Sequence, residues 1–115
     1  MTSTIMGSPS LEDLQAAAEE ASGLLRVLAN PDRLLLLCQM TQGEFCVSDL
    51  ETSTGIRQPT LSQQLTVLRD EGMVATRREG KQIFYRITSK EGLAVLQTLY
   101  LLYCGDGESR KGSGT

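Results

Sequence analysis

Three cysteines are the residues of this chain best able to do covalent chemistry: Cys38, Cys46 and Cys104. The 115 residues include no histidine, which excludes histidine-based general-base catalysis and every zinc site that needs an imidazole ligand. The chain has no C-x-x-C motif either, which disfavours a thiol oxidoreductase. In a reducing compartment such thiols are buried core residues, metal ligands or redox sensors. From the residues alone, the simplest interpretation of Cys38 and Cys104 is that both are small core residues.

A second chemical feature is the polar face of a helix predicted within residues 47–72. This segment is predicted to form two short helices joined by a turn at Gly55. In the second helix Leu61, Leu65 and Leu68 follow the i, i+4, i+7 spacing of one buried stripe. The opposite face carries Thr60, Ser62, Gln63 and Thr66. Such short donors and acceptors suit base edges in a DNA groove, and an ordinary amphipathic helical hairpin is the alternative.

Charge is distributed unevenly along the chain, although a net charge of −3 looks unsuited to nucleic acid. Residues 1–52 carry two arginines against eight acids, whereas residues 53–88 carry six basic residues against three acids. Residues 89–115 balance at three of each. The positive part therefore coincides with the polar helix face, and a dimer would double that basic surface.

The elements that must hold these residues are predicted by capping and periodicity. Ser10 begins a long helix whose narrow stripe of small and apolar residues suits packing against another helix, including one from a second subunit. Asn30-Pro31 ends that helix and begins a second one, which is apolar nearly all round and must be central. Gly72 ends the polar-faced helix. Ser89 caps a last helix that is too apolar for one small monomer to cover.

After Gly72 the period changes from 3.6 to 2, which predicts two strands at residues 73–78 and 82–88. A short hairpin directly after a helix-turn-helix is typical of a wing, and Arg77, Arg78 and Lys81 cluster toward its tip. A solvated hairpin is the alternative explanation of these charges. The predicted fold class is mainly α with a small β-hairpin (α+β), a dimeric winged helix-turn-helix of about five helices and a two-stranded wing.

One domain is predicted at residues 10–104, between disordered tails at residues 1–9 and 105–115. The first residues lack the basic and apolar regions of a secretory signal. No apolar run approaches the ~18 residues that a membrane span needs. These features predict a cytoplasmic protein with no membrane contact.

The order helix, helix, helix-turn-helix, wing and helix is that of a winged-helix DNA-binding domain. At this point the chain resembles the ArsR/SmtB family of bacterial repressors over nearly its whole folded length. The match is carried by Leu28-Ala29-Asn30-Pro31-Asp32-Arg33-Leu34, Gly43-Glu44-Phe45, Val47-Ser48-Asp49-Leu50, Gln58-Pro59-Thr60-Leu61-Ser62-Gln63-Gln64-Leu65, Leu68-Arg69, Arg77-Arg78, Gly80-Lys81-Gln82 and Phe84-Tyr85-Arg86-Ile87.

The resemblance implies a homodimer built from the first and last helices, with two recognition helices in successive major grooves of a pseudo-palindromic double-stranded DNA operator. The DNA-binding residues at matching positions are Arg57, Gln58, Thr60, Ser62, Gln63, Arg69, Arg77, Arg78 and Lys81. Gln63 is the best candidate for base recognition, because a carboxamide can pair bidentately with adenine. Arg57 and Arg69 are predicted phosphate contacts, and the wing residues should reach backbone or minor groove. Gln64 is predicted to be partly buried rather than a contact.

The signal is suggested by a closer resemblance, to the BigR/SqrR/HlyU-type subgroup of persulfide sensors. A cysteine after RLLLL and a second one in LYLLYC match that subgroup, as do the flanking GEF, QPTLSQQL and KQIFYR. The resemblance implies redox sensing by Cys38 and Cys104, which would answer a persulfide or polysulfide inducer. One thiolate takes up sulfane sulfur and the second cysteine closes a disulfide or polysulfide link. Oxidation is then expected to lower operator affinity and derepress sulfide-handling genes.

Other signals and functions are alternatives. Metal-sensing relatives use a Cys-x-Cys near the start of the third helix, but the partner position of Cys46 is Ser48, so no metal or cofactor is expected. Cys46 also takes an N-cap position, where a thiol is a poor acceptor. It is either a bystander or a third thiol that widens the response to general oxidants. The alternative functions are a metal- or oxidant-responsive repressor, an anti-repressor or activator displacing another DNA-bound protein, and a helical protein-interaction module; an enzyme is not expected.

Overall fold

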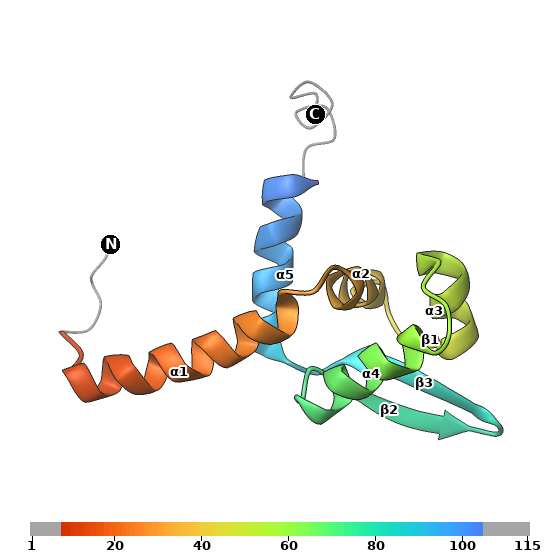
Figure 1. Ribbon diagram of the computed structural model, residues 1–115, viewed down its shortest axis with the longest axis horizontal. Coiled ribbons are helices and arrows are strands. Elements are labelled where there is room, and N and C mark those ends of the chain that lie inside the picture. The colour runs from red at the N-terminus through yellow and green to blue at the C-terminus, as the bar shows by residue number, and fades with distance from the viewer. Residues whose placement is uncertain (1–7, 105–115) are drawn as a thin grey trace.

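The computed structural model describes residues 8–104 and contains five helices and a small sheet (Figure 1). In chain order the elements are α1 (Leu11–Leu28), α2 (Pro31–Met40), β1 (Phe45–Cys46), α3 (Val47–Thr54), α4 (Thr60–Asp70), β2 (Val74–Glu79), β3 (Gln82–Ile87) and α5 (Lys90–Tyr103). The mainly helical α+β class and the helix-turn-helix followed by a wing are confirmed. The predicted tails lie outside the described residues, except for residues 8 and 9.

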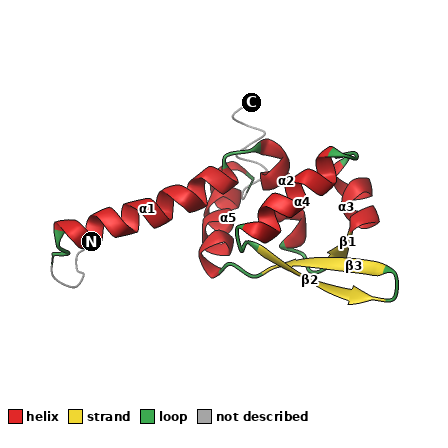
Figure 2. Ribbon diagram, turned by 60° about the horizontal axis from the view of Figure 1, so that its bottom comes forward, coloured by secondary structure: helices red, strands yellow, loops and turns green. Residues whose placement is uncertain are grey.

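The sheet has three antiparallel strands in the order β1-β3-β2, where the sequence predicts two. The added strand, β1, pairs Phe45 with Tyr85 and Cys46 with Phe84. A strand of two residues is too short to show an alternating pattern, which explains why periodicity missed it. Figure 2 shows the β2–β3 hairpin, called the wing from here on, projecting from below the helices with its turn at the far end. Gly80 makes that turn at a φ of 64°.

The predicted helix boundaries are set by side chains and glycines. Ser10, Asn30 and Ser89 each accept a backbone N–H of the first turn, at 3.0, 3.0 and 2.9 Å. Such bonds satisfy donors that the helix itself leaves free. Gly72 follows α4 at a φ of 77°, a left-handed conformation that glycine adopts without penalty.

The core is built around α2, as its apolar sequence predicts. Leu36 and Leu37 are completely buried, and the leucine stripe of α4 faces the same core. The largest fully buried side chains are Leu36, Leu37, Leu50, Leu61, Leu65, Leu68 and Leu96. The position of α4 is therefore fixed mainly by packing of aliphatic side chains. Complete burial of one leucine side chain stabilises the fold by about 1.5–3 kcal/mol.

The N-terminal part of α1 extends from the rest of the domain as an arm, and the C-terminal end of α5 also projects (Figure 1). Every residue from 11 to 22 is exposed. The exposed large apolar side chains of the two helices are Leu11, Leu14, Leu25, Tyr100, Leu101, Leu102 and Tyr103. The described protomer thus leaves uncovered an apolar surface that its own core does not use. None of the helices among residues 8–104 is long and apolar enough to cross a membrane.

Cys46 precedes α3 in an extended conformation, and its side chain makes no capping hydrogen bond. Replacing Cys46 by serine should stabilise the domain, because a hydroxyl oxygen can accept a free N–H at the start of α3. We expect the free energy of unfolding, measured by urea denaturation, to rise by ~0.5 kcal/mol or more. Cys46→Ala is the matched control, since it also removes the sulfur but offers no acceptor. Equal stabilities of the serine and alanine variants would contradict a capping position.

Candidate nucleic-acid interface and thiol pair

The turn between α3 and α4 is closed by hydrogen bonds that fix the direction of α4. Gly55 ends α3 in a left-handed conformation at a φ of 77°. The hydroxyl of Thr54 donates to the carbonyl of Leu50 at 2.6 Å and accepts the N–H of Ile56 at 3.2 Å. The buried Ile56 side chain then anchors the turn in the core. These local contacts explain why residues 47–70 form a rigid pair of helices.

The outward face of α4 presents the polar side chains that the sequence places opposite the leucine stripe. Ser62, Gln63 and Thr66 are exposed, and Thr60 is half-buried. Gln58 has a role that sequence reasoning missed, because its side-chain oxygen accepts the N–H of Ser62 at 3.0 Å. It therefore caps the start of α4 in addition to any contact with DNA. The position of Gln58, four residues before Ser62 in the first turn of α4, is the local signal that could have indicated this capping role.

Gln64 is half-buried, as predicted, and faces the interior of the domain. Its side-chain oxygen accepts a hydrogen bond of 2.8 Å from Nη1 of Arg33 on α2. Gln63 and Gln64 thus lie on different faces of one helix, one open to solvent and one attached to the body of the domain.

The basic residues of the wing are in two different states. Arg77 is paired: its Nε donates to Oε1 of Glu44 at 2.8 Å and its Nη1 to Oε1 of Glu79 at 2.9 Å. Its guanidinium carbon lies 4.8 Å from the centroid of the Phe84 ring. Hydrogen bonds with Glu79 and then Glu44 raise the pKa of Arg77 further above its ordinary value. A contact between Arg77 and DNA would have to compete with two carboxylates.

The remaining predicted cations are exposed: Arg57 before α4, Arg69 at its end, and Arg78 and Lys81 in the wing. Within residues 8–104 these four make no ion pair, so their charges are available to a polyanion. Glu44 belongs to the matched segment Gly43-Glu44-Phe45 but had no predicted role, and its Oε2 also lies 3.8 Å from Nη1 of Arg86. Phosphates could be contacted from both ends of α4 and from the hairpin turn.

Cys38 on α2 and Cys104 after α5 are exposed, so interpreting them as core residues is wrong for the described protomer. Partial burial raises the pKa of the Cys38 thiol, and repulsion from Cys104 raises it further. The pKa of Cys38 therefore depends on the charge of Cys104 as well as on burial. Residues 8–104 bring no three His, Cys, Asp or Glu side chains together as a metal site.

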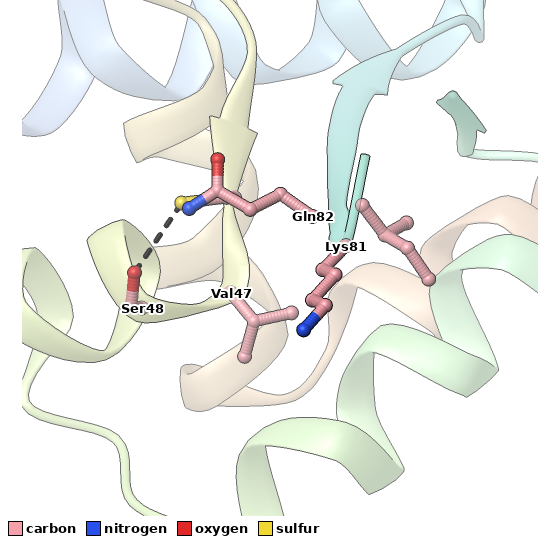
Figure 3. Close-up of a pocket in the computed structure, with 6 residues that line it drawn as sticks. Val47, Ser48, Lys81 and Gln82 are labelled. Carbon is pink, nitrogen blue, oxygen red and sulfur yellow. Dashed lines mark hydrogen bonds between the residues drawn. The ribbon is translucent and has the colours of Figure 1, made fainter. Parts of the chain in front are cut away.

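Cys46 is the buried cysteine and lies at a different place, beside a pocket of about 220 Å³ between the start of α3 and the wing (Figure 3). Its sulfur is 3.3 Å from the hydroxyl oxygen of Ser48. Lys81 and Gln82, from the turn of the wing and the start of β3, also line this pocket. The third thiol lies at the start of α3 rather than on α2 or after α5, and its burial favours the bystander interpretation.

A helix-turn-helix with an open polar recognition face, followed by a basic hairpin, defines a winged helix-turn-helix DNA-binding domain. Residues 30–76 match the family model "Bacterial regulatory protein, arsR family". The chain belongs to the ArsR family, as the sequence resemblance predicts, and is a transcriptional regulator rather than an enzyme.

Three known proteins illustrate the relationship. A biofilm growth-associated repressor of Agrobacterium fabrum is 47% identical over 104 residues, which cover 90% of this chain and 89% of the relative. The transcriptional activator HlyU of Vibrio cholerae is 36% identical over 87% of this chain and 94% of the relative. The crystal structure of the transcriptional repressor BigR from Xylella fastidiosa superposes with a TM-score of 0.77 at 48% identity, covering 84% of this chain and 98% of that one.

Glu44→Gln should make the wing more positive, because it removes the carboxylate that lies between Arg77 and Arg86. Arg77 would then be freer to reach a phosphate. The slope of log affinity against log salt, measured by fluorescence anisotropy with a labelled duplex, should steepen by up to about 0.9, the value of one added phosphate contact. Glu12→Gln, at the far end of α1, is the charge-matched control (Figure 1). The same change in both variants would mean that only net charge matters.

Proposed function

We propose that this chain is a homodimeric repressor of a pseudo-palindromic operator, released when Cys38 and Cys104 react with a persulfide or polysulfide. The observation that carries the proposal is a pair of exposed thiols, Cys38 on α2 and Cys104 directly after α5, of which Cys104 contributes to raising the pKa of Cys38. The repressor names of the relatives in Agrobacterium fabrum and Xylella fastidiosa support the direction of regulation.

The dimer is supported by the apolar surface left open on α1 and α5. Leu11 is 70% exposed, and Leu101 and Leu102 are 70% and 68% exposed. Removing such side chains from water favours association by a gross hydrophobic contribution of about 25 cal/mol per Å² of apolar area, from which the entropy cost of association is subtracted. A second copy of the chain offers the same two helices, so a twofold interface can cover both surfaces at once. It would bring two recognition helices to one side of the dimer.

DNA recognition is proposed for the exposed face of α4 and for the free cations around it. The exposed Gln63 would pair with a base edge, and Ser62 and Thr60 would contact bases or adjacent phosphates. Arg57 and Arg69 would bind the phosphate backbone on either side. The wing would add Arg78 and Lys81, with Arg77 and Gln58 as residues that have a structural partner as well.

The proposed sensing reaction begins when a thiolate of the pair attacks the outer sulfur of a hydropersulfide, RSSH. That cysteine becomes a persulfide and RS⁻ leaves. The second cysteine thiolate then attacks the inner sulfur of the cysteine persulfide, forms a disulfide and expels HS⁻. If both cysteines are persulfidated first, the same displacement leaves a trisulfide link and again releases HS⁻. No further oxidant is needed.

A covalent link between α2 and α5 would act on DNA binding through the core. α2 packs against α3 and α4. A shift of α2 toward α5 would therefore move the DNA-binding unit, which consists of α3, α4 and the wing and is called the reading head, relative to the dimer helices α1 and α5. The two heads would no longer match successive grooves, and affinity would fall. Activation by displacing another DNA-bound protein is a second candidate, because one relative is named a transcriptional activator.

Persulfide treatment should release DNA from the wild-type dimer but not from Cys38→Ser or Cys104→Ser, because neither variant can close the link. Cys46→Ser is the matched control and should respond like wild type. Gel shifts beside intact-mass spectrometry would measure DNA release and formation of the sulfur link, and metal or peroxide treatment would test the alternative signals. Equal release of a Cys38→Ser variant would overturn the sensing proposal.

Because the pKa of Cys38 is raised, its thiolate fraction and its reaction rate should increase as pH rises above neutrality.

Gln63→Ala and Arg57→Ala should weaken binding in different ways. Loss of a base contact costs about 1–3 kcal/mol on the selected operator and little on unrelated DNA. Loss of a phosphate contact weakens both and lowers the salt slope by about 1. Competition binding with operator and random duplexes distinguishes the two patterns. A Gln63→Ala variant with unchanged discrimination would contradict its assignment to base recognition.

A further inference from the structure

One guanidinium group connects three helices of the domain. Arg33, at the start of α2, donates from Nε to the carbonyl of Val27 at 2.6 Å and from Nη2 to the carbonyl of Arg26 at 3.3 Å, both in the last turn of α1. From Nη1 it donates to the side-chain oxygen of Gln64, in the middle of α4, at 2.8 Å. We call this set of four residues the Arg33 clasp.

The acceptors at the end of α1 suit a permanent cation. The last carbonyls of a helix lack the usual acceptor bond from the next turn, and they carry the negative end of its dipole. Here the carbonyl of Arg26 also accepts the N–H of Ala29 at 3.3 Å. Arginine satisfies them with a planar group whose donors have fixed directions and which stays charged at all accessible pH values. Because Nε and Nη2 of Arg33 are held by the end of α1, the direction of the remaining donor, Nη1, toward α4 is fixed as well.

The acceptor on α4 occupies a position that controls the orientation of that helix. Gln64 is half-buried, and in the sequence it lies between the core residues Leu61 and Leu65. Its neighbour Gln63 is exposed. Apolar packing of leucines holds α4 against the core but is not directional. The hydrogen bond from Arg33 is directional, and because one donor is charged it is stronger than a neutral one.

We propose that Arg33 and Gln64 are positioning residues that fix each recognition helix relative to α1, and so set the half-site spacing that the dimer accepts. The inference rests on the proposed function, because it needs the α1-containing dimer and a two-part operator. In such a dimer α1 belongs to the interface between the two protomers, whereas α4 belongs to the reading head that contacts DNA. Because the Arg33–Gln64 hydrogen bond fixes α4 relative to α1, the geometry of the dimer interface sets the distance between the two reading heads.

The test is a comparison of operators that differ only in spacing. Duplexes are first selected from random DNA by the wild-type protein and are then lengthened or shortened by one base pair between half-sites. Gln64→Met keeps the length of the side chain but removes the acceptor. We expect it to reduce the preference for the selected spacing roughly tenfold, the size of one hydrogen bond to a charged group. Affinity for a single half-site should change by less than about twofold, a small fraction of that bond.

Three variants accompany it. Gln64→Glu offers Arg33 an anionic acceptor and should keep the spacing preference, although its added negative charge lowers affinity for all DNA. Gln64→Asn keeps the amide but is too short to reach Arg33, so it should lose the preference as Gln64→Met does, and it replaces that variant if the latter folds poorly. Gln39→Met makes the same exchange at a half-buried glutamine of α2 and should behave like wild type.

The outcomes separate this inference from the function on which it rests. A wild-type protein with no spacing preference would overturn the two-part operator and the positioning role together. A wild-type preference that persists in Gln64→Met and Gln64→Asn would overturn the positioning role alone. Equal weakening on single and paired half-sites would assign Gln64 to general stability or to direct DNA contact, and would also overturn it.

Discussion

The complete burial of Leu36 and Leu37, on the inner face of α2, is the constraint on which the rest of the structure depends. Leu36 and Leu37 lose all contact with water, and the α1 end, α3, α4 and the sheet are arranged around them. A helix whose inner face is packed in this way cannot shift without disturbing its neighbours, since closely packed interiors transmit displacement. Its two ends are the places where polar chemistry occurs. Arg33 lies in the first turn and Cys38 near the last, so one rigid rod of ten residues joins the clasp to the candidate sensor.

An acidic chain can serve as a DNA-binding protein because its charges are separated in space as well as in sequence. The acids of α1 belong to an arm that points away from the wing (Figure 1). The head carries the basic residues, and fields of this kind decay within about 10 Å at moderate ionic strength. Glu44 is the exception, since it lies among arginines of the wing. Its pairing with Arg77 gives the hairpin a defined shape and withholds part of its charge from solvent.

Local signals in the sequence predicted much of the fold, and non-local contacts explain the misses. Ser10, Asn30 and Ser89 cap the expected helices because capping involves residues three positions apart. The leucine stripe of α4 was found for the same reason. By contrast, Glu44 and Arg77 are 33 residues apart, and Arg33 and Gln64 are 31 apart. No periodicity records such pairs. The exposure of Cys38 also escaped prediction, since the intrinsic preference of cysteine is for the interior.

The arm formed by α1 has a consequence for how the protein behaves at different concentrations. An isolated protomer must keep an 18-residue helix ordered while most of that helix contacts only water. The exposed part, residues 11–22, is short enough to be marginal as an isolated helix in water, so order in the arm would be gained at assembly. Folding and association then share one equilibrium, and apparent stability rises with protein concentration by mass action. In a cell, the amount of competent regulator would respond more steeply than linearly to its own synthesis, which gives the promoter it controls a threshold rather than a graded response.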